Sequence, residues 1–138
     1  MPTTVLGHIE AALFARVRDF SHSPALPISW PNVPFAPPAG AHLRVTHIPN
    51  MNRRLFLGSN DPHQRLGILQ IGVFAPFNQG TTAATEIAGE IEDHFPADLV
   101  MRSGPVVVRV ERAPESAQSI ADTAHWLVPV SIRYQAII

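Results

Sequence analysis

Proline constrains this chain more than any other residue. Of its fourteen prolines, six lie between residues 24 and 38. Proline fixes φ near about −65° and biases the preceding residue toward extended backbone, so this segment must run extended. The same segment carries five large apolar residues: Leu26, Ile28, Trp30, Val33 and Phe35. Because a solvated linker has no use for them, we expect a short edge strand near Ile28–Trp30 and then an arm along the surface. A disordered linker is the alternative.

Two segments have the periodicity of amphipathic helices. Residues 4–20 place apolar side chains three or four positions apart, and Thr3 or Thr4 can cap the N-terminus. Residues 82–95 show the same spacing, with acidic side chains mostly on the opposite side. Pro96 should end this second helix, because its ring clashes with the preceding turn. Each helix therefore has one apolar stripe that another element must cover.

Strand-like alternation appears in five further segments: His42–Ile48, Arg54–Gly58, Leu66–Ala75, Pro105–Ala113 and His125–Ile137. The second of these is either a separate strand or a continuation of the first after a bulge at Pro49–Asn52. Residues 59–64 have turn composition, which predicts a β-hairpin with a polar tip. Pro114–Thr123 reads as a polar connection with room for one helical turn. Pro129 lacks an amide proton, so we expect an edge position or a bulge there.

The order α-β-β-β-α-β-β predicts an α+β fold in a single domain over residues 1–138. Its simplest form is a mixed, mostly antiparallel sheet with two helices packed on one face. The other sheet face would still carry Ile68, Phe74, Val107 and Leu127. Several apolar residues on one such face indicate a partner.

Composition excludes several classes of protein. The chain has no cysteine, which rules out a disulfide scaffold, a thiolate metal site and a Cys nucleophile. Its ten basic residues are all arginine and the net charge is −1, so no global field attracts nucleic acid. The longest apolar runs are strand-sized, far below the ~20 residues of a membrane span. We expect a soluble protein with no membrane segment.

The residues also predict no catalytic site, metal site or cofactor. Seven histidines invite a metal site, yet no HExxH, HxxxH or HxH spacing occurs. A small-molecule- or metal-binding accessory domain remains the alternative, for example through His94, His125 and a carboxylate. Glu90, Glu92 and Asp93 fit a solvated helix face better than an acid–base pair. Nucleophile-elbow, dinucleotide and phosphate-loop motifs are missing from the sequence, so we do not expect an enzyme.

Three stretches together resemble a known family. They are Ile28–Phe35 (ISWPNVPF), Leu55–Gly58 leading into Arg65–Pro76 (RLGILQIGVFAP), and the helix ending in Asp93–Pro96 (DHFP). The chain resembles the tail-terminator-like proteins of long-tailed phages over about residues 5 to 135. The resemblance implies a structural virion protein that caps the tail tube as a hexameric ring, ends tail polymerisation and forms the surface on which the head docks.

The implied partners are further copies of the chain, the tail tube protein and a head-completion or connector protein, with DNA passing through the lumen. The implied location is the head-proximal end of the virion tail, after synthesis in the host cytoplasm. A ring gives each subunit two different contact patches. We expect them in the proline arm, the hairpin tip and the second face of the sheet. The candidate contact residues are Trp30, Pro31, Asn32, Phe35, Arg53, Arg54, Asn60 and His63. For Trp30 the alternative is that it covers the core of its own subunit.

Overall fold

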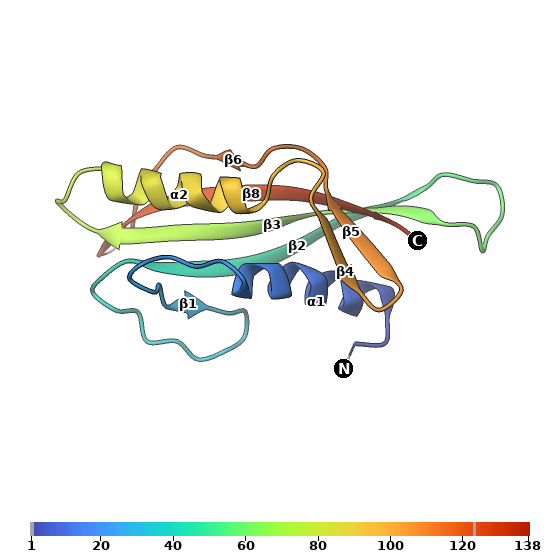
Figure 1. Cartoon of the computed structure of the whole chain (residues 1–138), viewed down its shortest axis with the longest axis horizontal. Helices are drawn as coiled ribbons and strands as arrows, with labels where there is room; N and C mark the ends of the chain where they lie inside the picture. Colours follow the sequence, from blue (N-terminus) through green and yellow to red (C-terminus); the bar gives the residue numbers. More distant parts are fainter. Residues whose placement is uncertain (1, 123) are drawn as a thin grey trace.

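The computed structural model describes residues 2–122 and 124–138 and combines two helices with a curled sheet (Figure 1). The helices are α1 (Val5–Arg18) and α2 (Thr82–His94). The strands are β1 (Ile28–Ser29), β2 (His42–Arg54), β3 (His63–Pro76), β4 (Val100–Ser103), β5 (Val106–Val110), β6 (Glu115–Ser116), β7 (Ile120–Asp122) and β8 (His125–Ile137). No helix within the described residues is long and apolar enough to cross a membrane.

Both helices form where the periodicity predicts them. Thr4 has extended backbone, and its hydroxyl accepts a hydrogen bond from the amide of Gly7 at 3.1 Å, as an N-cap should. α2 ends at His94, two residues before Pro96. The buried stripes are Ile9, Ala12, Leu13 and Val17 of α1, and Ala84, Ile87, Ala88 and Ile91 of α2.

Arg16 and His94 join the C-terminal ends of the two helices. The Arg16 guanidinium donates from Nε and Nη2 to the carbonyl oxygen of His94, at 3.1 and 2.8 Å. In return, His94 Nε2 donates to the carbonyl oxygen of Arg16 at 2.7 Å. Carbonyls in the last turn of a helix lack the usual partner one turn further on, so each helix here supplies a side-chain donor to a carbonyl of the other, and the Arg16 carbonyl also accepts from the amide of Asp19. Burial, the largest influence, lowers the pKa of His94 and favours its neutral form.

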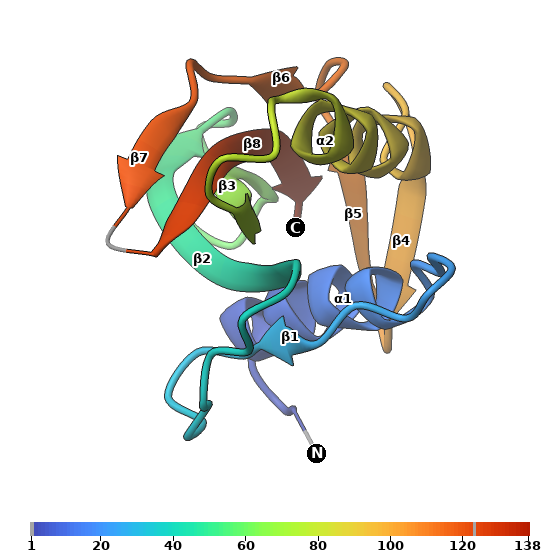
Figure 2. The same ribbon diagram turned by 90° about the vertical axis from the view of Figure 1, so that its left-hand side faces the viewer.

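The sheet runs in the order β1-β2-β3-β8-β5-β4, with β6 and β7 also paired to β8. Only the β1–β2 ladder is parallel among the described pairs, so the predicted mixed, mostly antiparallel α+β fold is confirmed. Figure 2 shows the curl, with β2, β3 and β8 on one side of the core and β4 and β5 on the other. α1 packs on β4 and β5, and α2 packs on β8 and β3.

One face of the sheet supplies the apolar core between these layers. Val45, Ile71 and Val130 are cross-strand neighbours in one inward-facing row, and all three are buried. A slip of one residue in either ladder would turn this row toward the opposite face, so burial fixes the register. Valines alternate inward along β5 as well, as the sequence pattern predicts.

A chain of polar side chains crosses this apolar core. His47 Nδ1 donates to Glu10 Oε1 at 3.1 Å, and His47 Nε2 shares a second hydrogen bond with the Tyr134 hydroxyl at 2.7 Å. Tyr134 is 1% exposed, and its pKa is raised to about 12, first by burial and then by Glu10. Gly67 faces Tyr134 across the β3–β8 ladder and leaves room for the ring. The chain thereby ties α1, β2 and β8 together.

Several expectations for single segments were wrong. The alternative of one strand continuing after a bulge at Pro49–Asn52 is confirmed, because β2 passes through a register shift there; β2 ends at Arg54, however, so residues 55–58 add no strand. β3 already begins at His63, which removes His63 and Gln64 from the expected turn. Strand β4 was not expected. Pro114–Thr123 has no helical turn among its described residues and instead contributes β6 and β7.

Pro129 lies in the centre of the sheet and not on an edge strand. His63 and Ile138 exchange both backbone hydrogen bonds, so alternation along the ladder makes Gly72–Pro129 a non-hydrogen-bonded pair with β3. The missing donor therefore faces the other side, where the chain passes from β6 to β7. There the carbonyl of Pro129 accepts from the amide of Ala117 at 2.9 Å. Proline is tolerated because the partner strand is interrupted at this point.

Candidate functional site

The proline arm (Trp30–Pro38), together with residues 39–41 that follow it, folds back onto its own subunit. The Trp30 ring lies 5.2 Å from that of Phe14, and the Arg18 guanidinium lies 4.9 Å from the Trp30 ring centre. Trp30 is half-buried and packs against the core. This is the alternative given for it above, that Trp30 covers the core of its own subunit. Its carbonyl accepts from the amide of Val33, and Asn32 has a φ of 56°, so Pro31 and Asn32 form the exposed corner of a tight turn.

Two buried histidines hold the far end of the arm against the sheet. His125 Nε2 donates to the carbonyl of Pro38 at 3.0 Å, and His42 Nδ1 donates to the carbonyl of Gly40 at 3.3 Å. The His42 ring stacks on Phe74 with centroids 4.6 Å apart and meets His125 edge-on at 4.8 Å. Burial lowers the pKa of His42, and the Gly40 carbonyl opposes this only in part. Imidazole N–H groups therefore dock the arm, and burial favours the neutral form of His42.

A hollow of about 670 Å³ opens between the arm and the sheet. It is lined by apolar and aromatic side chains from the arm, by His42 and His125, and by Arg44 at its rim. The Arg44 guanidinium is exposed and lies 5.0 Å from the ring centre of Phe74. Phe35, a predicted contact residue, lines this hollow with its ring 5.6 Å from that of His42. The hollow was not expected, because its walls come from segments far apart in the sequence.

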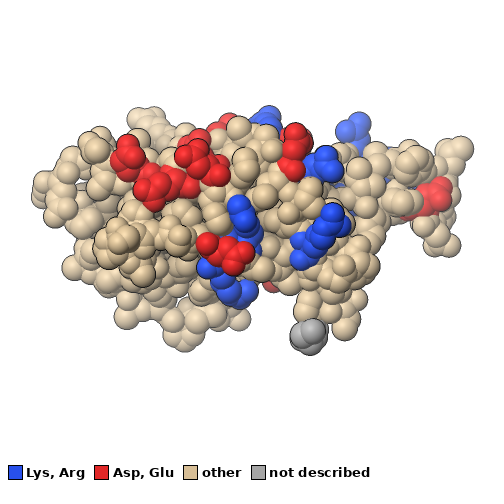
Figure 3. Space-filling model, in the orientation of Figure 1, with Lys and Arg blue, Asp and Glu red and all other residues tan. Residues whose placement is uncertain are grey.

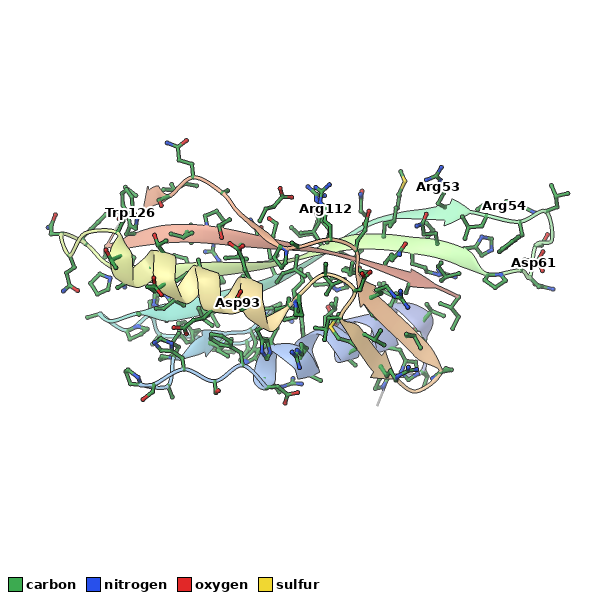
Figure 4. All side chains as sticks on the ribbon, turned by 45° about the horizontal axis from the view of Figure 1, so that its top comes forward. Arg53, Arg54, Asp61, Asp93, Arg112 and Trp126 are labelled. Carbon is green, nitrogen blue, oxygen red and sulfur yellow. The ribbon has the colours of Figure 1, made fainter. Side chains whose placement is uncertain are left out.

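The hairpin between β2 and β3 extends away from the body of the molecule, and its tip is apolar. Leu55, Phe56 and Leu57 are 41%, 52% and 97% exposed. Figure 4 shows Arg53, Arg54 and Asp61 at this end, far from Trp126. The expected polar tip was therefore only half right, since Ser59 and Asn60 share the loop with three large apolar side chains.

Side chains of the hairpin itself order this tip. The Arg54 guanidinium donates to the carbonyl oxygens of Phe56 and Leu57. The Asp61 carboxylate accepts from the amide of Gly58 at 3.0 Å, while the Asp61 amide donates to the carbonyl of Gly58. These bonds close the loop and turn the apolar side chains outward, so the tip is a built feature with defined shape.

The predicted contact residues thus fall into two groups. Trp30, Pro31, Asn32 and Phe35 lie on the arm, and Arg53, Arg54, Asn60 and His63 lie on or near the hairpin tip. Arg53 and Asn60 are exposed, whereas Arg54 is engaged with its own loop and His63 is half-buried at the start of β3. Their role in subunit contacts stays a prediction.

The second sheet face and the surface charge complete the candidate surfaces. Val107 is 38% exposed, Ile68 and Leu127 are half-buried, and Phe74 is covered by His42. Figure 3 shows acidic side chains gathered over α2, with arginines farther toward the hairpin. Acidic and basic patches on one chain suit contacts between unlike surfaces.

The histidines do not converge on a metal site. The described residues include no group of three or more His, Asp or Glu side chains placed to hold an ion. His94 and His125, the pair considered from the sequence, donate to backbone carbonyls of different segments, those of Arg16 and Pro38. Each ring thus already has a structural partner.

Comparison with known proteins identifies the family of the chain. A family described as "Phage tail terminator protein" matches residues 8–134. A solved structure superposes with a TM-score of 0.76 at 34% identity, covering 93% of this chain and 92% of the other. No protein with a curated description matches the chain. The chain belongs to the phage tail terminator family and is a structural protein of the phage tail.

Proposed function

We propose that this chain closes the head-proximal end of the tail tube as a hexameric ring, ends tail polymerisation and forms the surface on which the head docks. The observation that carries the proposal is the ordered apolar hairpin tip, which leaves Leu57 97% exposed at one end of an elongated subunit. A monomeric protein rarely leaves such side chains in water, so the tip favours an assembled state.

A ring suits this subunit because its two ends are unlike. The apolar tip lies at one end of β2, and the arm with its hollow lies at the other. Contacts between unlike patches are heterologous, and heterologous contacts close into rings when the rotation between neighbours permits. The proposed partners are other copies, the tail tube protein and a head-completion or connector protein.

The test measures tube growth directly. Tail tube protein is polymerised with increasing amounts of the purified chain, and tube lengths are measured by negative-stain microscopy. Capping predicts shorter tubes as the ratio of chain to tube protein rises, with an annular density at one tube end. Unchanged lengths and bare ends at every ratio would refute the proposal, whereas a monomer in the absence of tubes would not.

A matched control separates capping from unspecific effects of added protein. Leu13 is fully buried in α1, so Leu13→Asp places a charge in the core and should prevent folding. This variant should leave tube lengths unchanged at the same concentrations. If DNA passes through the lumen along arginine side chains, binding of assembled rings to duplex DNA should weaken steeply with salt.

A further inference from the structure

We propose that the hairpin tip of one copy, Leu55–Leu57, inserts into the arm hollow of a second copy, so that copies join head to tail. This contact rests on the proposed ring function and specifies which two surfaces form each joint. The protruding tip is the knob, and the hollow between arm and sheet is the hole.

The knob is a rigid apolar projection. Arg54 and Asp61 bind the loop backbone on either side of the apolar residues, so the side chains of Phe56 and Leu57 are held outward. Holding the loop in this shape before contact reduces the conformational entropy lost on binding. Nothing in its own subunit covers Leu57.

The hole has the matching chemistry. Phe35, Pro37 and Pro38 line it from the arm, and Phe74 lines it from the sheet. His42 and His125 also line the hollow, while their donor nitrogens bind arm carbonyls. Its volume of about 670 Å³ exceeds the needs of one side chain and suits a short loop.

Charge complementarity favours a second copy as the occupant. Asp61 is the acidic residue of the tip loop, and Arg44 is the basic residue at the rim of the hollow. Both side chains are exposed, so a seated tip brings a carboxylate to a guanidinium.

The geometry prevents one copy from filling its own hollow. β2 begins with His42 at the hollow and ends with Arg54 at the tip, so twelve residue steps separate them. At about 3.3 Å per residue the separation is about 40 Å. Figure 1 shows the two features at opposite ends of the molecule. Each copy therefore offers its tip to one neighbour and its hollow to another.

The surface area buried in one joint indicates that a single joint is weak and that a closed ring is stable. Burying the exposed parts of three large apolar side chains and the matching wall removes on the order of 600 Å² from water. Stable interfaces bury about 1,200 Å² or more, so one joint holds two copies only weakly. Closure of the ring on a tube end, where every copy makes two joints, stabilises the assembly.

The experiment uses single cysteines, because the natural chain has none. Asn60→Cys marks the tip without altering Leu55–Leu57, and Ala39→Cys marks the rim of the hollow. The two variants are mixed at high concentration under mild oxidation, and disulfide-linked dimers are measured on non-reducing gels. The proposal predicts that this mixture yields at least five times as much mixed dimer as a mixture of Asn60→Cys with Leu6→Cys. Leu6 is the control site, since it is exposed on α1 and belongs neither to the hollow nor to the tip loop, although it lies beside the stem of the hairpin at Pro49–Asn52.

A second change tests the knob itself. Leu57→Asp, added to Asn60→Cys, should remove the excess, whereas Leu6→Asp in the same background should preserve it. Both side chains are more than half exposed, so neither change disturbs the fold. An excess insensitive to Leu57→Asp, or cross-linking of the tip to tail tube protein alone, would overturn the proposed joint.

The two proposals fail in different ways. If Leu57→Asp still shortens tubes like the unaltered chain and the mixed dimer shows no excess, the joint is wrong and the ring function stands. If the dimer forms as predicted but tubes grow unchecked, the joint stands and capping is wrong. A small molecule that binds in the hollow and raises the melting temperature of the protein, yet does not lower the yield of mixed dimer, would also overturn the joint.

Discussion

Gly67 should be a position where adding a single methyl group strongly destabilises the protein. A Cβ on Gly67 would lie 2.3 Å from the Tyr134 hydroxyl oxygen and 2.5 Å from Cζ of the same ring. Real Cβ atoms do not approach other atoms so closely, so the ring must move within a packed core. Overpacking of this kind costs about 1–3 kcal/mol.

Displacing the ring also breaks the hydrogen bond to His47, which spans 2.7 Å. A buried group left without its partner costs about 1–3 kcal/mol. The lower chain entropy of alanine in the unfolded state returns about 0.4–1 kcal/mol. Gly67→Ala should therefore lower the free energy of unfolding by roughly 1–5.5 kcal/mol, a large share of the ~5–15 kcal/mol typical of a domain.

The assay is denaturant unfolding, with Gly89→Ala as the matched control. Gly89 lies in α2, and a Cβ there meets no atom within 4 Å, so the same substitution should stabilise the helix by up to about 1 kcal/mol. Tyr134 is the single tyrosine, so phenolate absorbance reports its pKa alone. That pKa should fall from about 12 toward its ordinary value of about 10 as Gly67→Ala pushes the ring toward solvent. Equal denaturation midpoints for Gly67→Ala and Gly89→Ala, with an unchanged pKa of the Tyr134 phenol, would refute the packing described for Tyr134.

Three further outcomes are expected. Burial lowers the folded pKa of His42 and of His94 below 6.5, so the unfolded chain takes up protons first as the pH falls. The contribution to stability should therefore be complete above about pH 6.5 and be lost as the pH drops through the folded pKa values. Unfolding midpoints measured at pH 7.5 and pH 5 check this. Arg16→Ala removes two hydrogen bonds to the carbonyl of His94 and should cost about 1–3 kcal/mol in the same assay, with Arg18→Ala, which lacks such bonds, costing less. His125→Ala frees the carbonyl of Pro38, so limited proteolysis should cut the arm faster while β2 and β3 stay protected.

The sequence predicted the elements whose ends are set locally. α2 ends where Pro96 requires, and β8 occupies its expected range because apolar and polar residues alternate through it. β4 was missed because its four residues are too few to show a period, and it is a strand only through its ladder with β5. The family resemblance was carried by motifs that span the chain, and the family match confirms it.

The two surfaces of the proposed joint were harder to anticipate. Leu55–Leu57 has the composition of a strand, and only the capture of two loop carbonyls by Arg54 turns it into an exposed tip. The hollow depends on His42 and His125, which are brought together by the β2–β3–β8 ladders across more than eighty residues. No local sequence pattern predicts that these two histidines lie side by side, because their proximity follows from the register of the strand pairing.

The central position of β8 has a consequence for synthesis. It pairs with β3, β5, β6 and β7, and it follows every one of them in the chain. A nascent chain can form the β2–β3 and β4–β5 ladders early, but the two halves of the sheet are joined only after residues 125–137 have emerged from the ribosome, and such distant pairings form slowly. Until then β3 offers an open edge that invites aggregation or chaperone binding. The subunit therefore completes its sheet only when its last strand has been made.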